Sequence, residues 1–263
     1  MIKRLIANIL PALMALVLFS FSASHVSAQN IRPRHDVHVA DSARYRYRTS
    51  ESYIRERIQY LDDKAVRCYE NESMAVYYTR RGREAFRFEN DRMVLPKKGE
   101  RPAQKKYLKR RFVRSQRREF WREGCAVVAI KAWTVSNPKY NSWPSRKFVG
   151  ISSEMDSLID AFHKAGDDFN VLNDALALGS TADELSRQEI YYIKISPKDR
   201  RFRYDFPDGN ENGAYDNLWV PGGLTMLGIK ECVLTRADKV TYKTNDFESF
   251  LKNFDSSNVV RLR

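Results

Sequence analysis

The stretch that decides the fold class is SEMDSLIDAFHKAGDDFNVLNDALALGSTADELSRQEIYYIKISPKDRRFRYDF, residues 153–206. Apolar side chains recur at helical spacing over Met155–Phe162, and Gly166 is a typical residue for the end of that helix. Glu189–Ser196 and Arg201–Phe206 are rich in aromatic and β-branched residues, which favour strands. Helices and strands follow one another without regular strand–helix–strand alternation, so we predict an α+β fold of mixed helices and short antiparallel strands.

Upstream of this stretch, the same signals predict a helix, a hairpin and a strand. Apolar residues in Ile54–Cys68 step by three and four, which places Cys68 on the buried face of a helix. Met74–Thr79 and Glu84–Phe88 favour a β-hairpin with Gly82 in its turn. Cys125–Val135 is apolar enough to be a largely buried strand.

Further helices and strands are expected within and beyond the stretch. Asp168 can cap a helix that ends at Gly179, and Thr181-x-x-Glu184 is a capping box for a short helical turn. Leu224–Leu234 and Lys239–Lys243 are strand candidates, and Asn245 can cap a final helix.

The N-terminal residues 1–28 have the three parts of a cleavable signal peptide in order. Lys3 and Arg4 make the start of the segment positive. An uncharged apolar core follows over Ile9–Phe21, and Val26-Ser27-Ala28 offers a cleavage site. The core is shorter than the roughly 18–20 apolar residues of a membrane span. We therefore expect an exported protein of the bacterial envelope, periplasmic or associated with the envelope, or else secreted.

The mature chain is expected to carry one main domain. Residues 29–50 are polar and Arg-rich without periodicity, as in a flexible arm. Residues 51–263 are long enough for one α+β domain, or for two lobes divided near 136–150. No second long apolar stretch follows, so we predict no transmembrane span in the mature chain.

Three cysteines, Cys68, Cys125 and Cys232, leave an odd count in an oxidising compartment. One disulfide in any of three pairings with one free thiol, and three buried free thiols, are both compatible with the sequence. A chain of this size does not depend on disulfides for its core.

Positive charge is concentrated in one segment, from Lys97 to Arg122. The formal net charge is +13, and this segment alone carries twelve Lys or Arg against Glu100 and Glu119, which is +10. Its composition after Pro102 favours helix, although its apolar residues scatter around a helix axis that starts there. The candidate binding residues are Lys105, Lys106, Lys109, Arg110, Arg111, Arg114, Arg117, Arg118 and Arg122.

This segment favours contact with a polyanion or an acidic protein partner. Aromatic residues between the cations would allow stacking on nucleic acid, but export argues against that ligand. A solvated helix whose charges serve only solubility is the alternative. Tyr140 and Trp143, in a loop over residues 136–147, are candidates for aromatic contact with a glycan or protein, and Trp219 lies beside another loop.

The loop DGNENGAYD, residues 208–216, looks like the calcium loops of the EF-hand type. Candidate ligands are Asp208, Asn210, Asn212 and Asp216, with Gly213 at the sharp turn. The position that should supply a bidentate carboxylate is Trp219 instead. No other cofactor is indicated. The only close histidine pair, His35 and His38, lies in the expected arm and lacks two further ligands.

Catalytic motifs are weak. Cys125 and Cys232 lack a neighbouring base, with His163 the only histidine in a predicted helix or strand, and no G-x-S-x-G elbow occurs. Our leading hypothesis is a non-enzymatic envelope protein that binds a partner or polyanion through residues 97–122. A hydrolase acting on an envelope polymer is the alternative, which a deep pocket with two or more convergent titratable groups would favour. A calcium-stabilised binding module using residues 208–216 is the third hypothesis.

Overall fold

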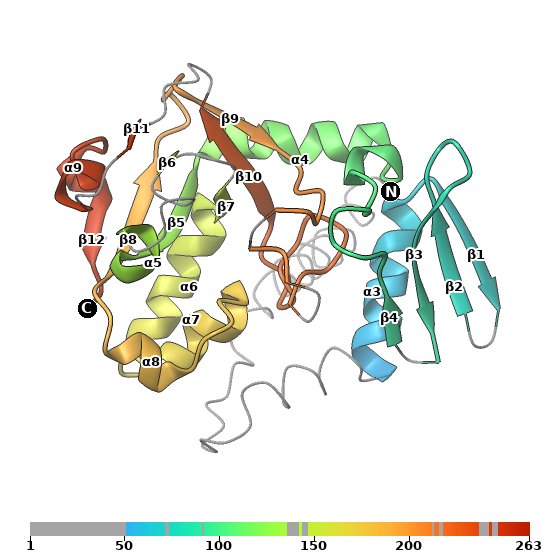
Figure 1. The fold of residues 1–263 in the computed structure, drawn as a ribbon, viewed down its shortest axis with the longest axis horizontal. Helices are drawn as coiled ribbons and strands as arrows, with labels where there is room; N and C mark the ends of the chain where they lie inside the picture. The colour runs from blue at the N-terminus through green and yellow to red at the C-terminus, as the bar shows by residue number, and fades with distance from the viewer. Residues whose placement is uncertain are drawn as a thin grey trace, which may run out of the picture. The chain divides into compact units, whose positions relative to one another are not determined.

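The computed structural model describes residues 51–71, 74–90, 92–135, 142–143, 147–211, 213–215, 218–236, 242–243 and 247–263, with the backbone alone at 67–71, 134–135, 142–143, 236, 242–243 and 249. All of these residues belong to one compact unit, drawn in Figure 1. The predicted signal peptide, the arm over residues 29–50, Tyr140 and the Asn245 cap lie outside the described residues.

The first sheet is an antiparallel meander of four consecutive strands with a helix against it. Its elements are α3 (Glu51–Lys64), β1 (Arg67–Asn71), β2 (Met74–Tyr78), β3 (Glu84–Glu89) and β4 (Arg92–Val94). The predicted hairpin is confirmed, because β2 pairs with β3 from Met74 opposite Glu89. The predicted helix to Cys68 is wrong at its end: α3 stops at Lys64, and Cys68 lies in β1 opposite Tyr77.

Aromatic rings fill the space between this sheet and α3. Tyr77 stacks on Phe86 with ring centroids 4.6 Å apart, and both rings are almost fully buried. Tyr53, Ile54 and Leu61 of α3 belong to the same cluster. Side chains from the far half of the chain join them, so this sheet is part of a larger core.

The second sheet has six strands in the order β12-β8-β5-β7-β10-β9, and every neighbouring pair is antiparallel. This arrangement confirms the α+β class. The strands are β5 (Cys125–Ile130), β7 (Lys147–Ile151), β8 (Ile190–Ile195), β9 (Phe202–Asp205), β10 (Glu231–Arg236) and β12 (Val259–Arg261). Both β5 and β7 belong to this second sheet, so the chain passes from the first sheet to the second between β4 and β5.

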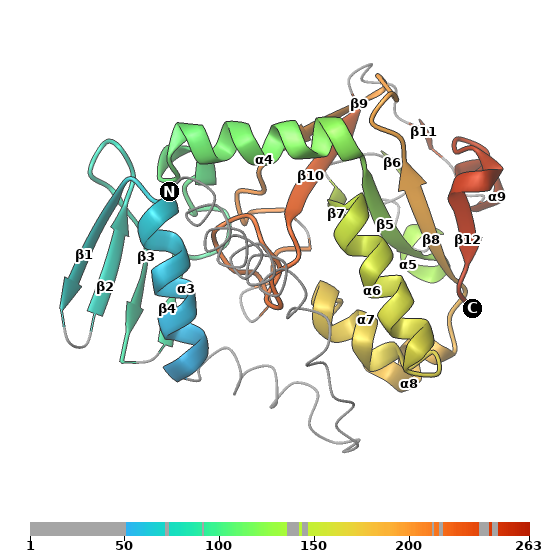
Figure 2. The same cartoon turned by 180° about the vertical axis from the view of Figure 1, so that it is seen from behind.

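Helices cover both faces of the six-stranded sheet. One face packs against α6 (Ser152–Lys164), α7 (Phe169–Leu176) and α8 (Ala182–Ser186), as Figure 2 shows. The other face receives Phe120 from α4 (Arg110–Glu123) and Phe250 from α9 (Phe247–Leu251). The remaining short elements are the 3₁₀ helices η1 (Gln104–Lys106) and η2 (Ser256–Asn258), α5 (Lys131–Val135), and the β6 (Ser142–Trp143) and β11 (Tyr242–Lys243) pair.

Capping residues set the helix ends as predicted. Gly166 follows α6 with φ at +72°, a backbone conformation that a side chain disfavours. Asp168 caps α7 by accepting a hydrogen bond from the Asn170 backbone N–H at 3.0 Å. Thr181 and Glu184 form the reciprocal capping box of α8.

Two predicted strands are too long. The strand from Cys125 ends at Ile130, and α5 takes the rest up to Val135. The strand predicted from Leu224 begins only at Glu231, because Gly228, at a φ of +93°, interrupts an extended backbone between these residues. Strand β12 at the C-terminus was not predicted, since its few residues carry little pattern.

No helix in the described part of the chain is both long and apolar enough to cross a lipid bilayer.

Candidate functional site

Helix α4 carries most of the predicted binding residues, and it begins later than the sequence predicts. Residues 104–106 form η1 instead, and Tyr107 and Leu108 are fully buried beyond it. The helix ends at Gly124, whose N–H donates to the Phe120 carbonyl at 2.8 Å. A Cβ at Gly124 would lie 2.4 Å from the Ile195 carbonyl oxygen, so only glycine fits where α4 meets the sheet.

The inner face of α4 is anchored on both sheets, as Figures 1 and 2 show. Phe112 and Val113 pack on the cluster of the first sheet, and Phe120 is buried in that of the second. Between them, the Gln116 side chain donates to the Gly223 carbonyl at 2.7 Å and the Glu231 carbonyl at 3.0 Å. The expected scatter of apolar residues is therefore wrong in part: Tyr107 and Leu108 precede the helix, and Phe112, Val113 and Phe120 share its inward face, while Trp121 stays 39% exposed.

The nine predicted cations are all exposed on or just before α4. Two of them have a described carboxylate within 4.0 Å: Lys105 lies 3.8 Å from Asp205, and Arg122 lies 2.6 Å from Glu123. In the described part of the chain, no ion pair engages the other seven, which are Lys106, Lys109, Arg110, Arg111, Arg114, Arg117 and Arg118. The structure therefore leaves most of this charge facing solvent.

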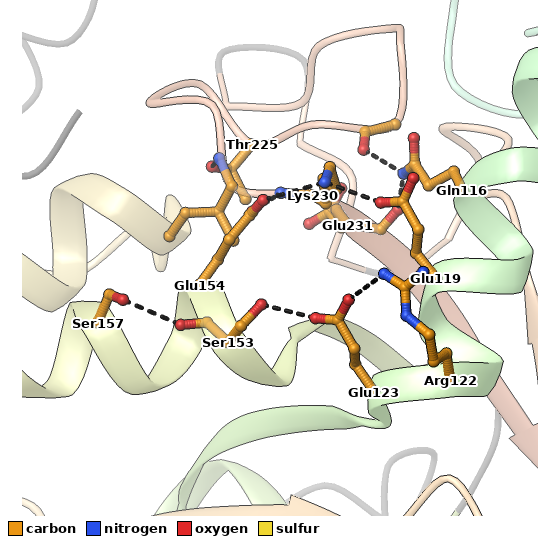
Figure 3. Close-up of polar contacts among 12 residues, drawn as sticks. Gln116, Glu119, Arg122, Glu123, Ser153, Glu154, Ser157, Thr225, Lys230 and Glu231 are labelled. Carbon is orange, nitrogen blue, oxygen red and sulfur yellow. Dashed lines mark hydrogen bonds and ion pairs between the residues drawn. The ribbon is translucent and has the colours of Figure 1, made fainter. Parts of the chain in front are cut away.

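The acidic residues of α4, Glu119 and Glu123, contact neighbouring segments on the inner side of the helix (Figure 3). Glu119 binds the Lys230 ammonium at 2.8 Å, and Glu154 of α6 lies 3.5 Å from the same group. Glu123 accepts a hydrogen bond from the Ser153 hydroxyl at 2.8 Å. The Arg122 hydrogen bond and then that of Ser153 lower the pKa of Glu123. These contacts hold α4 to α6 and the loop before β10, and they leave little negative charge on the outer face.

The predicted calcium loop makes a turn closed by its own side chains. Glu211 accepts hydrogen bonds from the backbone N–H groups of Asp208 and Gly209, each at 2.9 Å. Asn210 accepts from the Gly99 N–H at 2.7 Å and donates to the Arg101 carbonyl at 2.9 Å. The buried Arg101 guanidinium donates to the Gly209 carbonyl at 2.5 Å, which places a cation against the loop.

This geometry does not favour calcium. Asn212 and Asp216 lie outside the described residues, and within those described no group of three or more His, Cys, Asp or Glu side chains could hold a metal ion. Asp208 instead forms a local Asx turn, since its side chain accepts a hydrogen bond from the Asn210 backbone N–H at 3.0 Å. Asn210 docks the loop onto residues 99–101.

The structure does not bring Cys125 or Cys232 together with His163. Cys125 and Cys232 are free and almost fully buried, and burial raises the pKa of each thiol. They lie on β5 and β10 with β7 between, roughly 10 Å apart at the strand spacing of a sheet, which is too far for a disulfide. His163 is exposed on α6, 2.6 Å from Asp167. Cys68 and Trp143 have described backbones only.

A cavity of about 860 Å³ opens where β5 and β7 separate. These strands pair only at Cys125–Ile151 and Ala126–Gly150, while β5 continues its pairing with β8 and β7 with β10. The next residues of β5, Val127 and Val128, line one wall of the cavity, and Lys147 and Phe148 of β7 line another. The rest of the described lining comes from Trp133, the end of α7 with residues 177–179, residues 208, 210, 211, 213, 215 and 218–220, and Leu224, Thr225 and Glu231.

Several titratable side chains converge on this cavity: Asp208, Glu211, Glu231 and Lys147. Burial, and then the nearby charge of Glu211, raises the pKa of Glu231 to about 8. Burial also lowers the pKa of Lys147. The sequence offers little sign of this site, because its members come from four separate segments. A charged residue at the start of an otherwise apolar strand, as Glu231 and Lys147 both are, is the one available signal.

Trp219, predicted near a loop, is buried against the same cavity with the Arg101 guanidinium 5.1 Å from its ring centre.

Comparison with family models, curated proteins and solved structures finds no match for this chain.

Proposed function

We propose that this chain is an exported protein of the bacterial envelope that binds an acidic envelope component or an acidic protein partner through the outer face of α4 and the residues just before it. The observation that carries the proposal is the set of seven exposed cations without a described carboxylate partner. Export rests on the N-terminal sequence pattern.

The rigidity of α4 supports this proposal. Its fourteen residues span about 21 Å at 1.5 Å per residue, and both ends of its inner face are fixed in hydrophobic clusters. The cations are therefore held as an array, so less conformational entropy is lost on binding than with a flexible basic tail. Five of the seven are arginines on the helix, whose planar guanidinium groups suit phosphate and carboxylate oxygens.

The proposal is tested by replacing five cations with glutamine: Lys105, Lys106, Lys109, Arg110 and Arg111. Binding of the mature protein to native envelope fractions, and to heparin as a defined polyanion, is measured at rising ionic strength. Wild-type binding is expected to weaken as salt rises, because exposed charges are screened. The five-fold variant should bind about tenfold more weakly or worse, with a flatter dependence on salt.

A matched control removes the same number of exposed cations elsewhere, by changing Lys164, Arg187, Lys198, Arg200 and Lys252 to glutamine. The control has the same net charge as the test variant, so an equal loss in both would mean that only total charge matters. Unchanged binding in the test variant would refute the proposal.

A hydrolase acting on an envelope polymer is a second candidate function, favoured by the cavity and its converging titratable groups. Wild-type protein would then release soluble fragments from purified envelope polymer, and Glu231→Gln would slow release by about a hundredfold or more. The absence of any release by the wild-type protein would remove this candidate.

A further inference from the structure

The mouth of the cavity carries exposed aromatic rings. Of the described residues, the large hydrophobic side chains that stay exposed include three aromatics: Trp121, Trp133 and Tyr215. Two of these, Trp133 at 44% exposure and Tyr215 at 51%, line the cavity. Large rings left in water beside a cavity are typical of binding sites, because they give apolar contact area at low entropic cost.

The interior of the cavity excludes several classes of ligand. An aliphatic chain would leave the charged and polar groups of Lys147, Glu211 and Asp208 without water and without new partners, which is costly. A strongly anionic ligand would face the carboxyl side chains of Asp208 and Glu211, and Lys147 is the one cationic residue among the described residues that line the cavity. A ligand with many hydroxyl groups avoids both penalties, because a hydroxyl can donate to a carboxylate and accept from an ammonium.

A carboxylate can accept several hydrogen bonds at once, from protein groups and from ligand hydroxyls together. Glu211, for example, accepts from the backbone N–H groups of Asp208 and Gly209 and also lines the cavity. Glu231, on the β10 wall, can also donate a hydrogen bond while its carboxyl group is protonated. The cavity volume of about 860 Å³ lies in the range of about 300–1,000 Å³ that is common for small-ligand sites.

We propose that this cavity binds a neutral oligosaccharide, with Trp133 and Tyr215 packing against sugar rings at its mouth and the carboxyl groups inside bonding to sugar hydroxyls. Two aromatic rings at the mouth suit a ligand of at least two sugar units. This proposal concerns binding alone. It holds independently of the cationic face of α4 and of any hydrolysis.

The test screens the mature wild-type protein against an array of neutral and acidic glycans, followed by calorimetric titration with the best neutral oligosaccharide. Trp133→Ala and Tyr215→Ala are each expected to weaken binding about tenfold or more, because each variant lacks a ring that packs against a sugar. Binding should change little between 0.05 and 0.5 M salt, roughly the range in which exposed charges become screened. The binding to envelope fractions proposed above is expected to weaken over that range.

Trp121→Ala is the matched control, because Trp121 is 39% exposed but lies on α4 outside the cavity lining. It should leave saccharide affinity unchanged. Circular dichroism verifies that each variant folds. The proposal fails if no glycan binds, if only acidic glycans bind, or if the Trp133 and Tyr215 variants bind as well as the control.

Discussion

The outer face of α4 and the cavity between β5 and β7 place their charged groups in opposite environments. On α4 and just before it, seven cations are exposed to solvent without described carboxylate partners. In the cavity, a few ionisable groups are surrounded by protein, and burial shifts the pKa of Glu231 to about 8. A dense cluster of exposed charges and a buried group with a strongly shifted pKa therefore indicate different kinds of site. The first indicates long-range attraction and the second indicates a confined site.

The largest expected effect comes from detaching α4 from the second sheet. Phe120→Ala removes a fully buried ring and should destabilise the protein by about 3–5 kcal/mol. If polyanion binding depends on a rigid α4, it should weaken as well, because the cations are no longer held in a fixed array. Chemical denaturation measures the first effect and heparin binding the second. Tight binding by a strongly destabilised variant would mean that the array need not be rigid.

Glu231 should make stability depend on pH. Its folded pKa lies above the unfolded value, so its contribution is fully present below about pH 4.5 and is lost as pH rises towards 8. The loss is at most about 1.4 kcal/mol per pH unit in that window. Glu231→Gln should flatten this dependence and be more stable than wild type above pH 8. Denaturant titrations at a series of pH values measure it, and parallel curves for the two proteins would contradict the pKa.

Gln116 joins the two regions, since its side chain bonds to the Gly223 carbonyl and to the Glu231 backbone carbonyl at the cavity wall. Gln116→Ala should cost about 1–3 kcal/mol, because it leaves two carbonyl groups buried without that partner. Gln116→Met keeps the volume but not the bonds, and should be nearly as destabilised. Equal stability of the methionine variant and wild type would show that packing alone matters there.

The smallest effect is expected for the outer cations. Arg110→Gln, Arg114→Gln and Arg118→Gln should each change stability by no more than about 0.5 kcal/mol, because these side chains lie in solvent without a described ion pair. Denaturation midpoints provide the measurement. Marked destabilisation by any of them would mean that the charge serves the fold rather than a partner.

The parts of the fold that sequence predicts are those set by local rules. The Asp168 cap, the Thr181 capping box and the β2–β3 hairpin depend on residues close together in the chain, and all three are confirmed. The start of α4 and the end of the strand from Cys125 depend on contacts with distant segments, such as the bridge between Ala65 and Leu108. These long-range contacts override local propensity, so both boundaries were misplaced.

The same distinction applies to the sites. The cationic residues are adjacent in sequence, so composition alone identifies them. The cavity depends on a break in the pairing of β5 with β7 and on side chains as distant as Lys147 and Glu231, which no local pattern joins.

The fixed position of α4 has a consequence for proteolysis. Lys105-Lys106, Arg110-Arg111 and Arg117-Arg118 are dibasic sequences that trypsin-like proteases would cleave in an unfolded chain. Such proteases bind substrates in an extended form, and α4 cannot extend without withdrawing Phe112, Val113 and Phe120 from two hydrophobic clusters. In the folded protein, the Arg110-Arg111 and Arg117-Arg118 peptide bonds should therefore resist digestion, although the side chains of both pairs are exposed.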